Sequence, residues 1–261
     1  MTRSRRRKTK NQRKKRRNSA LAIAGVLLLA ALFFVAKCDL LHLRDRAPAR
    51  IPDGYNAFCI DISHHNGVVR DWDHLRIHVR EDGTFTSSKE EAAASYPVTM
   101  IYMKATEGEK MHDRHFLIQW TEARKRSISV GAYHFFLTDK DPKAQAENYI
   151  RTVGLLRERD LAPVLDIEKV HKGCTREQLN KAVRIWLETV EAHYGKKPII
   201  YTSDHFASRM LSQEIIASYR IWIAHYDTSA PDFQNWSLWQ FTDRGLVEGI
   251  DGYVDISVER S

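Results

Sequence analysis

Short apolar segments recur along residues 57–258, and most of them end in polar or aromatic residues. Their length favours strands over helices. We expect strands at residues 58–63, 100–105, 129–136, 162–168, 198–203, 220–225, 237–241 and 253–258. Helical periodicity falls between them, at about 112–126, 141–157, 175–194 and 204–217, with a further short helix near 71–77.

Strands that alternate with helices predict βαβ units and a parallel sheet, and eight such strands close into a barrel. The links at 226–236 and 242–252 are too short for a helix with its two loops. Residues 77–97, with the turn sequence Glu81-Asp82-Gly83-Thr84, form an insertion that we expect to be a hairpin. The fold class is therefore α/β, an irregular TIM-like barrel with about five helices.

The strand at 162–168 ends in two carboxylates, in the sequence Leu161-Ala162-Pro163-Val164-Leu165-Asp166-Ile167-Glu168. Side chains alternate along a strand, so Asp166 and Glu168 share one face and repel each other, which raises at least one pKa. A neutral carboxylic acid beside an ionised one can cleave a glycosidic bond. The alternative is a pair of solvated or ion-paired acids at a strand end.

Active sites of such barrels lie at the C-terminal ends of the strands. The polar and aromatic residues expected there are Asp61, the loop 63–67, Lys104, Glu107, Tyr133, His134, Asp166, Glu168, Tyr201, Trp222, His225, Tyr226, Trp239, Gln240 and Asp255. The four carboxylates Asp61, Asp166, Glu168 and Asp255, set among aromatic rings, predict an acidic cleft for a sugar, because aromatic faces stack on sugar rings.

The N-terminal region changes how the net charge of +8 is interpreted. Residues 1–37 hold twelve of the 41 Lys/Arg and no acid, so the remainder carries 29 bases against 33 acids. Residues 20–36 are an unbroken apolar run, long enough to approach the hydrocarbon thickness of a bilayer as a helix. It exceeds the core of a cleaved signal peptide, and no small-residue cleavage site follows it.

We therefore divide the chain into a basic cytoplasmic tail (1–19), a transmembrane signal anchor (20–36), a linker (37–56) and a barrel (57–261). The positive-inside rule keeps the tail in the cytoplasm and exports the barrel to the periplasm or the cell exterior. Nucleic-acid binding by the tail is the less economical interpretation, because the adjacent apolar run already explains the charge.

The cysteine and histidine residues give no sign of a metal or a disulfide framework. The chain has three cysteines and no CxxC or HExxH motif, so we expect no metal and no cofactor. Cys59 is expected to be a buried small hydrophobe. His64 and His65 are adjacent on a loop that we expect to be extended, with their side chains pointing apart. His134 is expected to be a buried, hydrogen-bonded histidine in preference to a general base.

Seven motifs, taken in order, resemble glycoside hydrolase family 25, the Chalaropsis-type lysozymes that cut peptidoglycan. They are Ile60-Asp61-Ile62-Ser63-His64-His65-Asn66-Gly67, Met103-Lys104-Ala105-Thr106-Glu107-Gly108, Gly131-Ala132-Tyr133-His134-Phe135, Leu165-Asp166-Ile167-Glu168, Ile200-Tyr201-Thr202, Trp239-Gln240 and Val254-Asp255. The resemblance implies a (β/α)5(β)3 barrel and an N-acetylmuramidase that hydrolyses the β-1,4 bond between N-acetylmuramic acid and N-acetylglucosamine. Asn66, Ser257 and the long 77–97 insertion depart from the family pattern.

The resemblance also implies roles for individual residues. Glu168 is the general acid, and Asp166 either stabilises the developing positive charge or orients the substrate's 2-acetamido group as an internal nucleophile. Asp61 binds substrate or tunes this pair. The residues expected to bind substrate are Asp255, Tyr133, Tyr201, Trp239, Gln240, Lys104 and Trp222. The expected partners are peptidoglycan glycan strands and, through residues 20–36, the membrane; we expect a monomer that binds no nucleic acid.

Two rival functions remain at this point. The first is the same barrel without activity, holding glycan at the cell surface. The second is a hydrolase of another 2-acetamido glycan such as chitin, although chitinase-like barrels resemble a longer Asp-x-x-Asp-x-Asp-x-Glu strand, and Pro163 and Val164 stand here before Asp166.

The membrane topology can be tested directly. We expect a reporter enzyme fused after Ser261 to be active outside the cytoplasm, because the basic tail keeps only the N-terminus inside. Activity confined to the cytoplasm would contradict the topology. A mature protein that begins near Cys38 would show instead that the apolar run is cleaved.

Overall fold

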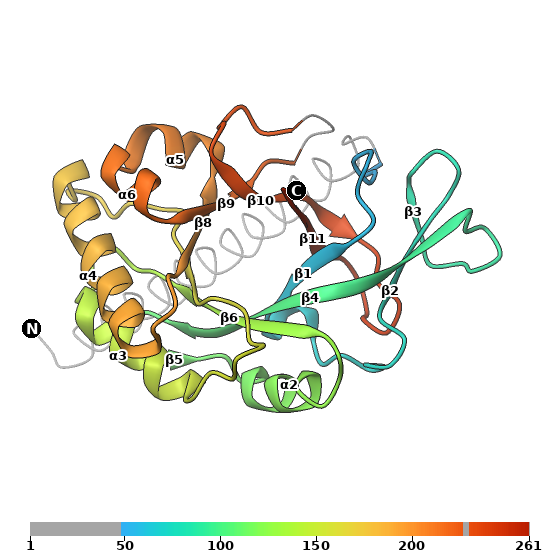
Figure 1. The fold of residues 1–261 in the computed structure, drawn as a ribbon, viewed down its shortest axis with the longest axis horizontal. Helices are drawn as coiled ribbons and strands as arrows, with labels where there is room; N and C mark the ends of the chain where they lie inside the picture. Colours follow the sequence, from blue (N-terminus) through green and yellow to red (C-terminus); the bar gives the residue numbers. More distant parts are fainter. Residues whose placement is uncertain (1–47, 227–229, 261) are drawn as a thin grey trace, which may run out of the picture. The chain divides into compact units, whose positions relative to one another are not determined.

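Eight strands close into a barrel in the computed structural model, which describes residues 48–226 and 230–260 (Figure 1). They are β1 (Phe58–Ile62), β4 (Ala94–Glu107), β6 (Ser129–Phe135), β7 (Val164–Asp166), β8 (Ile199–Ser203), β9 (Arg220–Ala224), β10 (Trp236–Gly245) and β11 (Val254–Glu259). Their order is β1-β11-β10-β9-β8-β7-β6-β4, and a parallel pairing of β4 with β1 completes the ring. The predicted barrel of eight strands is confirmed.

The last strand departs from the expected parallel arrangement. β11 is antiparallel to both of its neighbours, β10 and β1. The link between β10 and β11 is short, and a parallel connection needs a crossover of about a dozen residues or more. The chain therefore turns back as a hairpin, and it is the start of β11, not its end, that lies at the rim where the other strands finish.

Helices cover the outside of the barrel. They are α2 (Phe116–Ala123), α3 (Pro142–Val153), α4 (Arg176–Tyr194), α5 (Asp204–Met210) and α6 (Gln213–Ser218), together with the 3-10 helix η1 (His64–Asn66). α3 and α4 pack side by side (Figure 1). No helix occurs after α6 within residues 219–226 and 230–260, as the short links predicted.

Three helix predictions need correction. The helix expected at 112–126 begins only at Phe116, because Met111–His112 forms a short strand, β5, beside β4. The helix expected at 204–217 is divided, since the Ser212 side chain accepts a hydrogen bond from the Ile215 backbone and begins a new helix. No helix forms near 71–77, where Arg76–Val79 becomes strand β2.

The insertion at 77–97 is the expected hairpin, extended by one strand. β2 pairs antiparallel with β3 (Phe85–Thr86) and with the first residues of β4, which makes β4 longer than predicted. This small sheet projects from the barrel (Figure 1). Glu248, in the β10–β11 link, accepts from His78 Nε2 at 2.9 Å and pairs with Lys89 Nζ at 2.6 Å. The insertion therefore supports the link that leads into β11.

Side-chain alternation separates two apolar regions. Residues that face outward from the strands, among them Ile60, Ile101, Leu165 and Ile200, pack beneath the helices. Residues that face inward form a smaller cluster inside the barrel: Cys59, Tyr102, Val164, Ile199, Trp222 and Leu238. Cys59 is fully buried there, as expected.

Predictions about the N-terminal region fall outside the described structure. The tail (1–19), the anchor (20–36) and most of the linker (37–56) precede residue 48. Within 48–226 and 230–260, no helix has the length and apolar character needed to cross a membrane.

Gly131 on β6 is required by close packing inside the barrel. A Cβ atom at this position would lie 2.1 Å from Cε1 of Tyr102, whose ring crosses the barrel interior. We expect Gly131→Ala to destabilise the fold by about 1–3 kcal/mol, the usual cost of overpacking. Thermal unfolding measures this, with Ser129→Ala on the same strand as the control. Equal melting temperatures for the two variants would contradict the packing argument.

Candidate active site

A polar layer lies inside the barrel above the apolar cluster. Seven strands contribute a polar side chain to this layer: Asp61, Lys104, Tyr133, Asp166, Tyr201, Gln240 and Asp255. On five of these strands, the polar residue comes two positions after a member of the apolar cluster. Asp61 and Asp255 are register partners on β1 and β11. The sequence predicted all seven as site residues, and the barrel brings them to one rim.

Three aspartates in this layer have raised pKa values, and burial is the largest cause for each. Burial, followed by the charges of Glu168 and Asp61, holds the pKa of Asp166 well above its ordinary value, while Lys104 acts in the opposite direction. Burial raises the pKa of Asp61 to about 7, and that of Asp255 to about 8. Repulsion among the carboxylates adds to the shifts of all three aspartates.

The carboxyl group of Asp166 also has an oxygen without a hydrogen-bond partner in the described structure. Its side chain is buried, and its Oδ1 atom has no hydrogen-bond partner among the described residues. A buried polar atom without a partner is costly and often marks a functional site. Asp166 is therefore available to a substrate atom.

Glu168 occupies a different environment. β7 ends at Asp166, and Glu168 follows as an exposed residue. Its charge nevertheless contributes to the raised pKa values of Asp61, Asp166 and Asp255, so it lies close to all three. The pair thus consists of one buried and one accessible carboxyl group.

Gln240 joins Asp61 to two tyrosines. Its Nε2 donates to Asp61 Oδ2 at 2.8 Å, and its Oε1 accepts from Tyr201 at 2.8 Å and from Tyr226 at 2.7 Å. The sequence places Tyr226 at the rim but assigns it no role. An aromatic residue after a strand is the only sequence signal for it.

The two predicted tryptophans do not reach the surface of the cleft. Trp222 is buried in the barrel interior, where its Nε1 donates to Ser257 Oγ at 3.0 Å. Trp239 faces outward into the core, and its Nε1 donates to the backbone oxygen of His225 at 2.8 Å. Their placement indicates a packing role for both tryptophans, and neither side chain is exposed to a substrate in the cleft.

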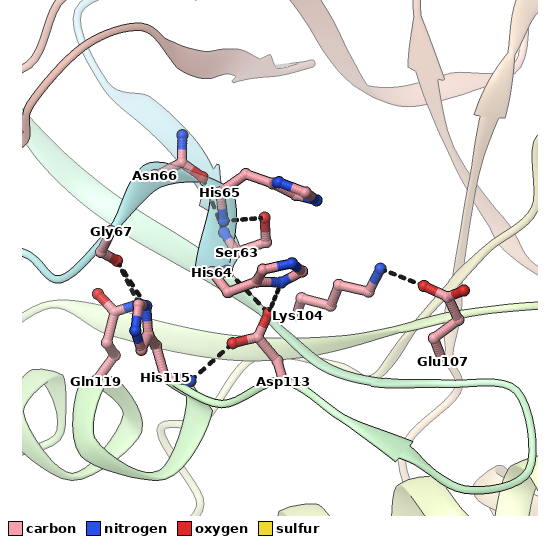
Figure 2. Close-up of polar contacts among 10 residues, drawn as sticks. All are labelled: Ser63, His64, His65, Asn66, Gly67, Lys104, Glu107, Asp113, His115 and Gln119. Carbon is pink, nitrogen blue, oxygen red and sulfur yellow. Dashed lines mark hydrogen bonds and ion pairs between the residues drawn. The ribbon is translucent and has the colours of Figure 1, made fainter. Parts of the chain in front are cut away.

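The loop after β1 is held by a buried carboxylate (Figure 2). Asp113 accepts from the backbone N–H of His64 at 2.8 Å, from His64 Nδ1 at 2.7 Å and from the backbone N–H of His115 at 2.9 Å. Burial alone would raise the pKa of Asp113, but these hydrogen bonds outweigh it and lower the pKa below its ordinary value.

The His64 and His65 side chains do not point apart as predicted. The loop forms a 3-10 helix, and their ring centroids lie 4.0 Å from each other. Ser63 caps this helix, and Asn66 Oδ1 completes the capping box by accepting from the Ser63 backbone N–H at 2.9 Å. Asn66 Nδ2 donates to the backbone oxygen of Tyr253 at 3.1 Å, which ties the loop to the start of β11. Within residues 48–226 and 230–260, no group of three His, Cys, Asp or Glu residues could hold a metal ion.

Lys104 has an ionic partner at the rim. Its Nζ lies 2.7 Å from Glu107 Oε2 (Figure 2) and 4.8 Å from the centroid of the Phe135 ring. The side chain is about 10% exposed, so it is a fixed cation within the layer. In this geometry Lys104 is a structural partner for Glu107, and it also favours the ionised form of Asp166.

His134 is the buried, hydrogen-bonded histidine that the sequence predicted. Its Nε2 lies 3.2 Å from Gln145 Oε1, and its Nδ1 lies 2.7 Å from Thr106 Oγ1. Gln145 Oε1 also accepts from the backbone of Leu137, so it acts as an acceptor and the proton of the neutral ring is on Nε2. Burial lowers the pKa of His134 to about 3, which keeps the ring neutral.

An α/β barrel with a pair of carboxyl groups at its mouth is compatible with a sugar-cleaving enzyme, and comparison with known proteins is more specific. Residues 60–250 match the model of glycosyl hydrolases family 25. The chain is 35% identical over 227 residues to the uncharacterised protein YegX of Escherichia coli, an alignment that covers 84% of this chain and 77% of YegX. The chain therefore belongs to glycosyl hydrolase family 25, and it is a glycoside hydrolase of the lysozyme type.

Two further similarities come from a characterised enzyme and a solved structure. Lysozyme M1 of Streptomyces globisporus is 30% identical over 210 residues, which cover 75% of this chain and 65% of that enzyme. A family 25 glycosyl hydrolase from Bacillus anthracis superposes with a TM-score of 0.66 at 28% identity, covering 83% of this chain and 94% of the other.

The raised pKa of Asp61 predicts a pH dependence of stability. A carboxyl group whose pKa is higher in the folded state than in the unfolded state stabilises the fold at low pH. That contribution is lost as the pH rises from about 4 to about 7. Asp61→Asn keeps the shape of the side chain but cannot ionise, so the variant does not lose stability as the pH rises. We therefore expect it to melt higher than the wild type at pH 8, on the order of a few °C.

Thermal melts from pH 4 to pH 8 measure the effect, and the difference between the two proteins should shrink toward pH 4. Asp53→Asn, on an exposed aspartate away from the rim, serves as the control. If the Asp61→Asn and wild-type profiles ran parallel across this range, the buried position of the Asp61 charge would be contradicted.

Proposed function

We propose that this protein hydrolyses the β-1,4 bond between N-acetylmuramic acid and N-acetylglucosamine in peptidoglycan, acting as a monomer. The observation that carries the proposal is the pairing of the accessible Glu168 with the buried Asp166 at the barrel mouth. Family membership and the similarity to lysozyme M1 support a peptidoglycan substrate.

Glu168 acts as the general acid. It is the exposed member of a group of four carboxyl residues, and so the one that a glycan chain entering from solvent reaches first. Its carboxyl group can donate a proton to the leaving oxygen of a bound glycan.

Asp166 acts beside it from within the barrel. Its Oδ1 is free of protein partners and can accept the N–H of a substrate 2-acetamido group or face the developing positive charge at the sugar ring. Either role uses the ionised form of Asp166, which burial disfavours and the charge of Lys104 favours. Asp61 and Asp255 tune this pair by their charge and bind the substrate together with Tyr133 and Tyr201.

The proposal extends to the location of the enzyme. Residues 20–36 anchor the chain in the membrane, and the barrel acts on the wall from the outer side. The basic tail and the uninterrupted apolar run in the sequence support this topology.

The mechanism predicts a large loss of activity in Glu168→Gln. The amide keeps the shape of the side chain but cannot donate an acidic proton, so activity should fall by about 10²-fold or more. Dye release from labelled peptidoglycan measures it, and thermal melts confirm folding. Glu188→Gln, on the exposed side of α4, is the matched control and should retain full activity.

The same assay separates the rival functions. A folded Glu168→Gln protein that kept more than about a tenth of wild-type activity would remove Glu168 from the acid role. A wild-type protein that binds walls without cleaving them would indicate a binding barrel. Faster cleavage of chitin oligomers than of walls would indicate the other 2-acetamido substrate.

A further inference from the structure

The side-chain amide of Gln240 makes three hydrogen bonds at the rim, and their directions depend on one another. Gln240 comes from β10, Tyr201 from β8, and Tyr226 follows β9, so three neighbouring strands converge on one amide group. Gln240 is almost completely buried, and all hydrogen bonds of its side-chain amide in the described structure are with Asp61 and the two tyrosines. It therefore has no water-facing alternative.

An amide group can stabilise either protonation state of a carboxyl group, depending on its orientation. With the NH2 group toward Asp61, it donates to the carboxylate and favours the ionised form. Rotated by 180°, it would present its oxygen to Asp61, accept a proton from the neutral acid and favour that form instead.

The two tyrosines decide between these orientations. Both hydroxyl groups donate to Gln240 Oε1, and the two hydroxyl groups are also hydrogen-bond neighbours of each other. Rotating the amide would remove the acceptor that both hydroxyl groups share, and since only one hydroxyl group can donate to the other, the second would lose its protein acceptor. The observed orientation is therefore strongly preferred.

We propose that Tyr201 and Tyr226 lock the Gln240 amide with its NH2 group toward Asp61, so that Gln240 is a positioning residue that favours the ionised form of Asp61 and holds its carboxyl group in one rotamer. Nothing else donates to Asp61 in the described part of the chain. The lock opposes the effect of burial, since the bond from Gln240 lowers the pKa of Asp61 while desolvation raises it.

Several other groups face Asp61 and must be kept constant in any test. They are Glu168 and Asp166 from the β7 end, Asp255 on β11, Tyr133 on β6, Cys59 on β1, and Tyr201 and Tyr226 themselves. Apart from the two tyrosines, the variants below leave all of them in place.

The lock also links ionisation at the barrel mouth to an accessible residue. Tyr226 is 44% exposed, whereas Gln240 is 1% exposed. A glycan that displaces the Tyr226 hydroxyl from Gln240 would weaken the lock and raise the pKa of Asp61. Occupancy of the cleft and the proton on Asp61 are coupled through this one contact. This consequence for turnover rests on the proposed hydrolysis, but the lock itself does not.

The test measures where Asp61 titrates in the full-length chain, held in mild detergent. Melting temperatures are recorded against pH for each variant and for the same variant with Asp61→Asn, and the difference isolates the Asp61 contribution. In the wild type, this difference should change up to about pH 7 and then level off. No hydrolytic activity is needed, so failure of the proposed function would leave this measurement intact.

Two variants remove the lock by independent routes. Tyr201→Phe with Tyr226→Phe removes only the two hydroxyl groups, and Gln240→Met removes the amide with little change in volume. In each variant, the pH at which the melting-temperature difference levels off (the levelling point) should rise by about one unit. Losing a hydrogen bond to a charged group typically shifts a pKa by about that amount. Tyr253→Phe, an exposed tyrosine at the same rim whose hydroxyl has no hydrogen bond within the described residues, should leave it unchanged.

Activity supplies a second readout. In both variants, the acid limb of the pH profile of kcat/KM on peptidoglycan should move upward by the same amount, which loss of packing alone would not produce. An unchanged levelling point in either folded variant would overturn the lock. If the double tyrosine variant did not fold, Gln240→Met alone would decide the outcome, and the reverse holds equally.

Discussion

The removal of carboxyl groups from water at the mouth of a closed barrel is the constraint on which the rest of this structure depends. Burial raises the pKa values of Asp61, Asp166 and Asp255, and mutual repulsion adds to each shift. Such an arrangement is unfavourable at neutral pH. It persists because apolar residues below it and outside it close the barrel independently of the rim.

The rim is supported by contacts that act at a distance from the chemistry. Asp113 holds the loop after β1, Asn66 ties that loop to the start of β11, and Glu248 ties the insertion to the β10–β11 link. Each contact joins segments far apart in the sequence. Together they set the positions of β1 and β11, the two strands that carry Asp61 and Asp255.

Much of the fold and the site could be predicted because strands alternate. The same two-residue period that places Asp166 inside the barrel places Leu165 outside it. Applied to β10, the rule shows that adjacent Trp239 and Gln240 cannot face the same way, so only one of them could line the cleft. The structure shows that this residue is Gln240. The sequence alone could therefore have shown that Trp239 and Gln240 do not both bind substrate.

The sequence by itself determined the barrel, the insertion and the seven polar positions at the rim, because these depend on local periodicity and strand-end chemistry. Only the tertiary structure decided the burial of Trp222, the proximity of His64 to His65, and the convergence of Tyr201, Tyr226 and Asp61 on Gln240. Most of these depend on which distant segments meet when the barrel closes, and no local pattern records that choice.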